Sequence, residues 1–127
     1  MARTKVVMIG LKSSVVDFDD WPQLSVETLE AAFRDVHEQL EREGFDAEWC
    51  LTDRGETARD VVRETLKRVG PDVVVIGNGV RSDPKLLELF EAVVNEVARS
   101  APGAALAFNT LPFDTPEAVR RALALRD

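Results

Sequence analysis

The sequence predicts an α/β fold, with a four-stranded parallel sheet between two layers of helices in a three-layer α/β/α arrangement. Four short apolar runs alternate along the chain with four longer segments whose apolar residues recur every three or four positions. The 127 residues suit one domain, spanning 1–127, with no need of a disulfide or a structural metal. Strict alternation gives parallel strands, because each right-handed crossover returns the chain to the same end of the sheet.

The apolar runs are the predicted strands. Residues 5–11 and 72–77 are almost continuous valine, isoleucine and methionine, which is typical of central strands covered on both faces. Residues 45–52 alternate between apolar and polar side chains, which favours an edge strand. The fourth strand is expected over 104–109. With the first and third strands at the centre, the strand order should be 2-1-3-4.

Each strand is followed by a helical pattern with its own start or stop signal. The first pattern ends before Gly44, a common terminating residue. Asp53 and Glu56 have the spacing of a capping box and predict the start of the second helix. Asp83 and Thr115, each followed by proline, predict caps for the third and fourth helices.

Composition excludes several classes of function. The formal net charge of −7 repels phosphate backbones and no basic stripe opposes it, so no nucleic-acid partner is expected. No apolar run approaches the roughly 20 residues that span a bilayer, and the N-terminus lacks a signal-peptide pattern, so a cytoplasmic protein without a membrane segment is expected. One cysteine, Cys50, and one histidine, His37, leave no multi-cysteine metal site and no Ser-His or Cys-His catalytic set.

The loop after the first strand, 11–24, is the longest in the chain and opens with a cation and two hydroxyls, Lys12, Ser13 and Ser14. It continues with three acidic residues and a tryptophan: Asp17, Asp19, Asp20 and Trp21. Ligands of open parallel sheets bind where successive connections diverge, here beyond the first and third strands. The functional interpretation is an anion-binding start followed by an acidic lid or metal site, and the structural one is a solvated loop with its tryptophan packed inward.

Two further loops meet the same edge of the sheet. The loop after the third strand contains Asn78, Gly79 and Arg81, and its backbone N–H groups and guanidinium suit a phosphate or carboxylate. Its Gly-x-Gly spacing resembles a dinucleotide fingerprint that lacks the third glycine, so a tight turn is the structural alternative. Asn109 and Thr110 follow the fourth strand and either bind a ligand or cap the strand end.

Two functional hypotheses follow. In the first, the crevice binds an anionic small molecule, bearing phosphate or carboxylate, through eight candidate ligand-binding residues: Lys12, Ser13, Ser14, Asn78, Gly79, Arg81, Asn109 and Thr110. If the protein is an enzyme, Asp17 is the nearest candidate general acid or base; no cofactor is indicated. As a surface residue, Arg81 should be replaceable by alanine with a loss of about 2 °C or less in melting temperature.

In the second hypothesis the chain is a non-catalytic protein-interaction or regulatory module. The run 104–108 carries no charge and forms an exposed edge, so we expect a homodimer through the fourth strand, or cover by the C-terminal segment. The predicted winding is flavodoxin-like without a fifth strand, and its size resembles a receiver domain of a response regulator. Leu11 and Lys12 stand where a receiver carries paired acids, and Asn78 replaces the phospho-acceptor, so the module would be a degraded receiver.

Residues 75–121 resemble a set of small bacterial flavodoxin-like or Rossmann-like proteins of no assigned activity. The motifs that carry this resemblance are Ile76-Gly77-Asn78-Gly79-Val80-Arg81, Leu89-Phe90-Glu91, Ala101-Pro102 and Phe108-Asn109-Thr110. The resemblance implies no particular chemistry. It implies that Arg81 and Asn109 belong to a recurring pattern, which favours a site in the crevice.

Overall fold

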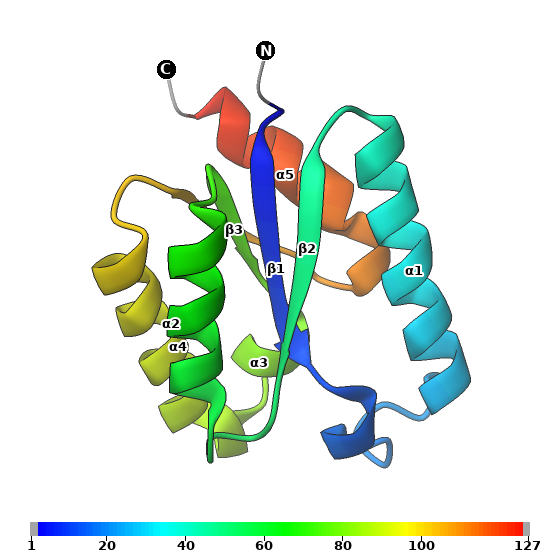
Figure 1. Cartoon of the computed structure of the whole chain (residues 1–127). Helices are drawn as coiled ribbons and strands as arrows, with labels where there is room; N and C mark the ends of the chain where they lie inside the picture. Colours follow the sequence, from blue (N-terminus) through cyan, green and yellow to red (C-terminus); the bar gives the residue numbers. More distant parts are fainter. Residues whose placement is uncertain (1–2, 126–127) are drawn as a thin grey trace.

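A computed structural model describes residues 3–125 and confirms the predicted fold, because four parallel strands form one sheet in the order β2-β1-β3-β4 (Figure 1). The strands are β1 (Lys5–Leu11), β2 (Asp46–Thr52), β3 (Val73–Ile76) and β4 (Ala105–Phe108). The helices are α1 (Val26–Arg42), α2 (Ala58–Val69), α3 (Asn78–Arg81), α4 (Leu87–Ser100) and α5 (Thr115–Ala124), with 3₁₀ turns η1 (Ser13–Val15), η2 (Pro84–Leu86) and η3 (Pro112–Asp114). All carboxyl ends of the strands point to one edge, at the bottom of Figure 1.

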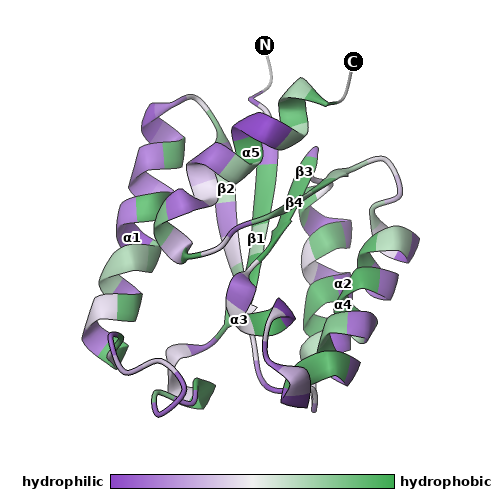
Figure 2. Cartoon of the chain, turned by 180° about the vertical axis from the view of Figure 1, so that it is seen from behind, coloured by the Kyte–Doolittle hydropathy of each residue, from purple (hydrophilic) through white to green (hydrophobic). Residues whose placement is uncertain are grey.

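The two central strands are buried on both faces, as their apolar runs predict. In β1, Val7 and Ile9 pack into the cluster under α2 and α4, while Val6 and Met8 pack into the cluster under α1 and α5. All four of these side chains are fully buried. Figure 2 shows β1 and β3 in hydrophobic colours between helices that carry hydrophilic residues on their outer sides. The hydrophobic effect on both faces of β1 therefore fixes the sheet between the two helical layers.

A side-chain cap starts α1, but the predicted cap of α2 is absent. The Thr28 N–H donates to the Ser25 hydroxyl at 3.2 Å, and α1 begins at the next residue after this cap. In contrast, the Asp53 carboxylate accepts hydrogen bonds from the N–H groups of Gly55 and Thr57, each at 3.0 Å. Asp53 therefore closes a loop, and α2 begins only at Ala58, so the predicted capping box is wrong.

The last two helices also differ slightly from the prediction. The Asp83 carboxylate accepts from the Lys85 N–H at 2.9 Å, as a cap does, but it starts the turn η2, and α4 follows at Leu87. Thr115 is the first residue of α5 instead of its cap. Residues 78–81, predicted as a glycine turn, form the short helix α3. The shifts at α4 and α5 arise because the 3₁₀ turns η2 and η3 precede these two helices.

The C-terminal helix covers one face of β4. Ala107 is buried there among Ala118 and Val119 of α5. On the opposite face, Leu106 and Phe108 are 42% and 38% exposed. The C-terminal segment therefore packs on a face of β4, and Leu106 and Phe108 on the other face are partly exposed.

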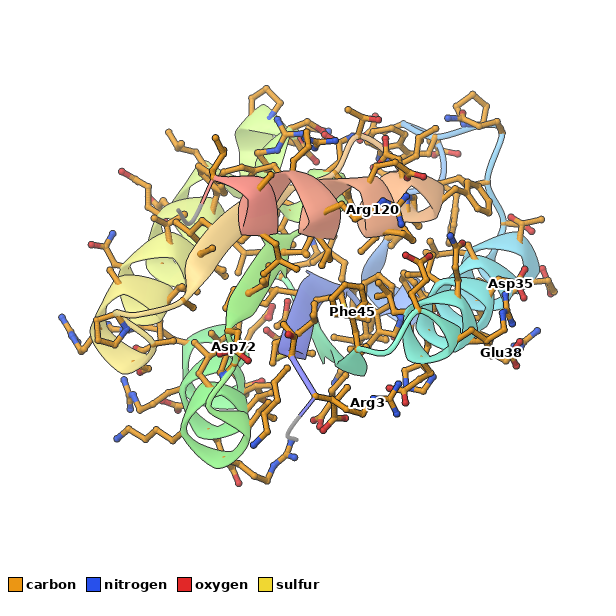
Figure 3. The ribbon with its side chains drawn as sticks, turned by 90° about the horizontal axis from the view of Figure 1, so that it is seen from above. Arg3, Asp35, Glu38, Phe45, Asp72 and Arg120 are labelled. Atoms are coloured by element: carbon orange, nitrogen blue, oxygen red, sulfur yellow. The ribbon has the colours of Figure 1, made fainter. Side chains whose placement is uncertain are left out.

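Charged side chains surround the fold (Figure 3). Asp35 and Glu38 project from the outer side of α1, and Arg120 of α5 forms ion pairs with Glu43 and Glu117. The pair between Arg120 and Glu43 links α5 to the end of α1 on the edge away from the carboxyl ends of the strands. Within residues 3–125, none of the helices combines the length and the apolar character that crossing a membrane requires.

Candidate functional site

Three glycines lie where the central strands end: Gly10 in β1, and Gly77 and Gly79 after β3. The Gly77 N–H donates to the Ile9 carbonyl at 2.8 Å, and a Cβ at position 77 would lie 3.0 Å from that oxygen. A side chain at position 77 would therefore press against the backbone of β1. No atom lies within 4 Å of a Cβ built at Gly79, and its φ is not positive, so no turn requires glycine there. Of these three positions Gly79 is the one that leaves open space at the sheet edge, because a Cβ at Gly10 would contact Leu51 and Trp49.

A cleft of about 80 Å³ opens above this glycine floor. Its walls come from the β1–α1 loop, α1, β2 and the segments that follow β3 and β4. The apolar residues of the wall are Leu11, Val16, Trp21, Leu24, Leu29, Phe33, Trp49, Leu86, Leu111 and Pro112. The cleft therefore lies at the topological switch point between β1 and β3, and most of its side chains are apolar.

The wall on the α1 side is held rigidly by two aromatic residues. The rings of Phe33 and Trp49 lie with centroids 4.6 Å apart and planes inclined by 47°. The indole N–H of Trp49 donates to the Phe33 carbonyl at 2.9 Å, which satisfies the polar atom of a half-buried ring. This contact joins β2 to α1 and fixes the shape of the cleft on that side.

Three charged side chains stand in the wall of the cleft, all of them half-buried: Asp17, Arg54 and Asp83. The Arg54 guanidinium donates to the Val15 carbonyl at 3.2 Å, which holds it beside the first loop. One oxygen of Asp17 accepts from the Asp19 N–H at 3.1 Å. The sequence predicts Asp83 as a helix cap and does not single out Arg54. The signal that both would meet the crevice is their place after β3 and β2, at the carboxyl ends of these strands.

Arg81 lies beside the cleft and connects the ends of β3 and β4. Its Nη2 donates to the Asn109 carbonyl at 2.8 Å and to the Asn78 Oδ1 at 3.1 Å. Its guanidinium carbon lies 5.8 Å from the centroid of the Phe108 ring, within the range of a cation–π contact. The Arg81 Nε is buried without a hydrogen-bond partner. Arg81 is therefore built into the structure, unlike the free surface residue that the sequence suggested.

Asn109 is the centre of the same network and is only 3% exposed. Its Oδ1 accepts from the Asn78 N–H at 2.8 Å, and its amide group donates to the Thr115 hydroxyl at 3.0 Å. The two asparagines and Thr115 thus link the start of α3 to the start of α5. The sequence left two roles open for Asn109, which are ligand binding and capping of the strand end. The structure shows its side chain in hydrogen bonds to other residues of the protein.

The rim after β4 is ordered by one carboxylate. Asp114 accepts hydrogen bonds from the hydroxyl and N–H of Thr110 and from the N–H of Leu111. Burial acts to raise the pKa of Asp114, but these hydrogen bonds prevail, and the pKa lies below its ordinary value. Asp114 stays ionised at neutral pH and holds Thr110 and Leu111 against the cleft.

The structure brings three of the eight candidate residues into the wall of the cleft: Asn78, Gly79 and Thr110. Arg81 and Asn109 lie beside it in the network described above. Lys12 and Ser14 are exposed, and the Ser13 hydroxyl donates to Glu30 at 2.8 Å, outside the wall. Trp21 lines the cleft, so the tryptophan of the long loop is packed inward.

The metal site and the histidine- or cysteine-based sites considered from the sequence are not formed among residues 3–125. No group of three or more His, Cys, Asp or Glu side chains in that range is placed to hold a metal ion. His37 lies on α1 with a ring nitrogen 3.8 Å from Glu41. Burial raises the pKa of the Cys50 thiol, which donates to the Thr65 hydroxyl at 3.6 Å, so this thiol is not an activated nucleophile.

No protein-family model and no curated protein matches the sequence of this chain. The chemistry of the cleft is therefore the feature that indicates a function.

Proposed function

We propose that the protein binds a small molecule carrying a carboxylate or phosphate group in the cleft at the carboxyl ends of β1 and β3. The observation that carries this proposal is an open cleft with a glycine floor beside Asn78. Because Arg81 donates to the Asn78 Oδ1, that oxygen already has a donor, and the NH₂ group of the same side chain is left to donate. A ligand oxygen is the natural acceptor for it.

The charge on Arg81 supports the same proposal. Within residues 3–125 Arg81 forms no ion pair, and its Nε is buried without a partner. A half-buried guanidinium without a counter-charge favours a negative group nearby. Arg54 supplies a cation in the wall itself. The apolar part of such a ligand would lie against Leu29, Trp49 and their neighbours, where burial of its surface contributes binding free energy.

The experiment is a thermal-shift screen of carboxylates and phosphates on three proteins: wild type, Gly79→Leu and Gly103→Leu. The Gly79 substitution adds a side chain in the cleft wall, while Gly103, in a turn before β4, also has a φ that is not positive and no atom within 4 Å of its Cβ. A ligand at a hundred times its dissociation constant adds about 2.7 kcal/mol, or about 10 °C in a domain of this size.

The shift should be lost in Gly79→Leu and kept in Gly103→Leu. Gly79→Ala serves as a second variant, because alanine in α3 should leave the melting temperature equal or higher while it narrows the cleft. A shift that survives Gly79→Leu would place the ligand elsewhere. A screen in which no carboxylate or phosphate shifts wild type would overturn the proposal.

A second candidate function is self-association through the edge of β4. Four large apolar side chains are exposed at or after this strand, between 38% and 57%: Leu106, Phe108, Leu111 and Phe113. β4 carries no charge, so pairing of two copies across a two-fold axis would oppose no like charges on the strand. The other edge strand, β2, carries Asp46 and Glu48, which disfavour such pairing.

Light scattering after size exclusion tests this homodimer. Leu106→Asp should convert a dimer into a monomer, whereas Val26→Asp should not, although Val26 is exposed to nearly the same extent at 39%. A monomer mass for the wild-type protein at micromolar concentration would exclude the dimer. The result is independent of the ligand screen.

A further inference from the structure

The charged groups of the cleft are of both signs and surround an apolar interior. Asp17 and Asp83 supply carboxylates from the first loop and from the segment after β3, while Arg54 supplies a guanidinium. All three are half-buried, whereas Leu29 and Leu86 of the same wall are buried. The polar part of a ligand therefore meets charges at the mouth, and its apolar part points toward the buried leucines.

An anion alone would not match this mouth. A ligand carboxylate at Asn78 and Arg54 leaves two protein carboxylates without a cation from the ligand. Asp17 and Asp83 each use Oδ1 to accept a backbone N–H, at 3.1 Å and 2.9 Å, and among residues 3–125 neither forms an ion pair. Each keeps acceptor capacity for a donor from the ligand, and an ammonium group carries three such donors.

The volume of the cleft limits the size of the apolar part of the ligand. A cavity of roughly 150 Å³ lined by aliphatic and aromatic side chains takes up benzene. The present cleft, at about 80 Å³, is near half that size and suits a branched chain of a few carbons better than a ring. Gly79 keeps part of the floor open, since no atom lies within 4 Å of a Cβ built there, so the chain can approach the backbone.

We infer that the ligand is a zwitterionic amino acid with an aliphatic side chain, an inference that rests on the proposed function of the cleft. The carboxylate accepts from the Asn78 amide and from Arg54. The ammonium donates to Asp83 and Asp17, and the aliphatic side chain packs against the buried leucines of the wall. A zwitterion is the class of ligand that matches the donor, the cation and both carboxylates at once.

The test uses three compounds with the same branched chain: leucine, 4-methylpentanoate, which lacks the amino group, and 3-methylbutylamine, which lacks the carboxyl group. Binding to the wild-type protein is measured by calorimetry. Leucine should bind at least about tenfold more tightly than either analogue, because loss of one charge-assisted contact has about that effect. Gly79→Leu should abolish binding of leucine, and Gly103→Leu should not.

Asp83→Asn identifies the ammonium contact. Asparagine keeps the oxygen that accepts the Lys85 N–H, so the turn before α4 is preserved. This variant should weaken the binding of leucine about tenfold and leave the affinity for 4-methylpentanoate unchanged or higher. The control is Asp35→Asn, which removes one carboxylate from the outer side of α1 (Figure 3) and should change neither affinity.

The outcomes separate the inference from the proposed function. Equal affinity for leucine and 4-methylpentanoate would overturn the zwitterion and leave the anionic ligand standing. Tightest binding of 3-methylbutylamine would overturn both. If leucine does not bind at millimolar concentration while a phosphate or another carboxylate shifts the melting temperature, the inference fails and the proposed function remains.

Discussion

Replacement of Glu96 by glutamine tests how α4 is held against α2. The Glu96 side chain is 0% exposed, although it is charged and lies on the surface helix α4. It accepts hydrogen bonds from the Ser100 hydroxyl at 2.6 Å, from Arg63 at 3.2 Å and 3.3 Å, and from Arg59 at 3.3 Å. Burial alone would raise the pKa of Glu96, but these hydrogen bonds outweigh it and lower the pKa from 4.5 to about 2.

The size of the effect follows from this pKa. A carboxyl whose pKa falls from 4.5 to about 2 on folding contributes at most about 3 kcal/mol to the free energy of unfolding at neutral pH. Arg59 and Arg63 are 54% and 38% exposed, so solvent screens part of their contribution. We expect Glu96→Gln to lower the free energy of unfolding by about 2 kcal/mol and the melting temperature by about 8 °C.

The direction of this pKa shift determines how the stabilisation by Glu96 changes with pH. Because the folded-state pKa is depressed, the stabilisation by Glu96 is fully present above pH 4.5 and is lost as the pH falls toward 2. Urea denaturation of both proteins between pH 7 and pH 3 should show a constant difference that narrows below about pH 4.5. Glu64→Gln, on the exposed side of α2, is the control and should stay within about 0.5 kcal/mol of wild type. Equal stability of wild type and Glu96→Gln at pH 7, or a difference that does not narrow in acid, would refute the reasoning.

Three further predictions concern single residues. Gly70→Ala should destabilise the fold by about 1 kcal/mol or more in urea denaturation, because Gly70 ends α2 with a φ of 62°; unchanged stability would contradict this. The Cys50 thiol should react with a thiol reagent only at the rate of unfolding, because burial raises its pKa, and rapid reaction of the native protein would show otherwise. Arg81→Ala should lower the free energy of unfolding by about 2 kcal/mol, because its hydrogen bonds to Asn78 and Asn109 are lost. A loss below about 0.5 kcal/mol in urea denaturation would show that Arg81 is the surface residue that the sequence suggests.

The sheet and the helices that cover it could be predicted because their signals are local. β1 spans the residues that the apolar run predicts, since burial on both faces requires an unbroken apolar sequence. The faces of β2 also follow from alternation, with Trp49 toward α1 and Cys50 toward α2. Strand order followed from which runs were most apolar and from the handedness of the crossovers.

Local signals failed where a polar side chain had more than one possible partner. Asp53 has the spacing of a capping residue, yet its carboxylate bonds to Gly55 and Thr57 in a loop that precedes the helix. Arg81 lies in a segment that resembles an anion-binding turn, and its guanidinium bonds to Asn109, which is 28 residues away in the chain. Asp53 chose between two local partners of nearly equal spacing, whereas the choice of Arg81 depends on which acceptor the packed strands bring within 3 Å, a distance that the sequence order does not contain.

The sequence by itself determined the class of fold and the edge of the sheet where a site would lie, because hydrophobic periodicity and the handedness of crossovers act over short stretches of chain. Only the tertiary structure decided what the site contains. Phe33, Trp49, Arg54 and Asp83 come from four separate segments and meet in one wall after the helices pack on the sheet. The shape and charge of the cleft are therefore properties of packing, since they arise from distances between segments that are remote in sequence.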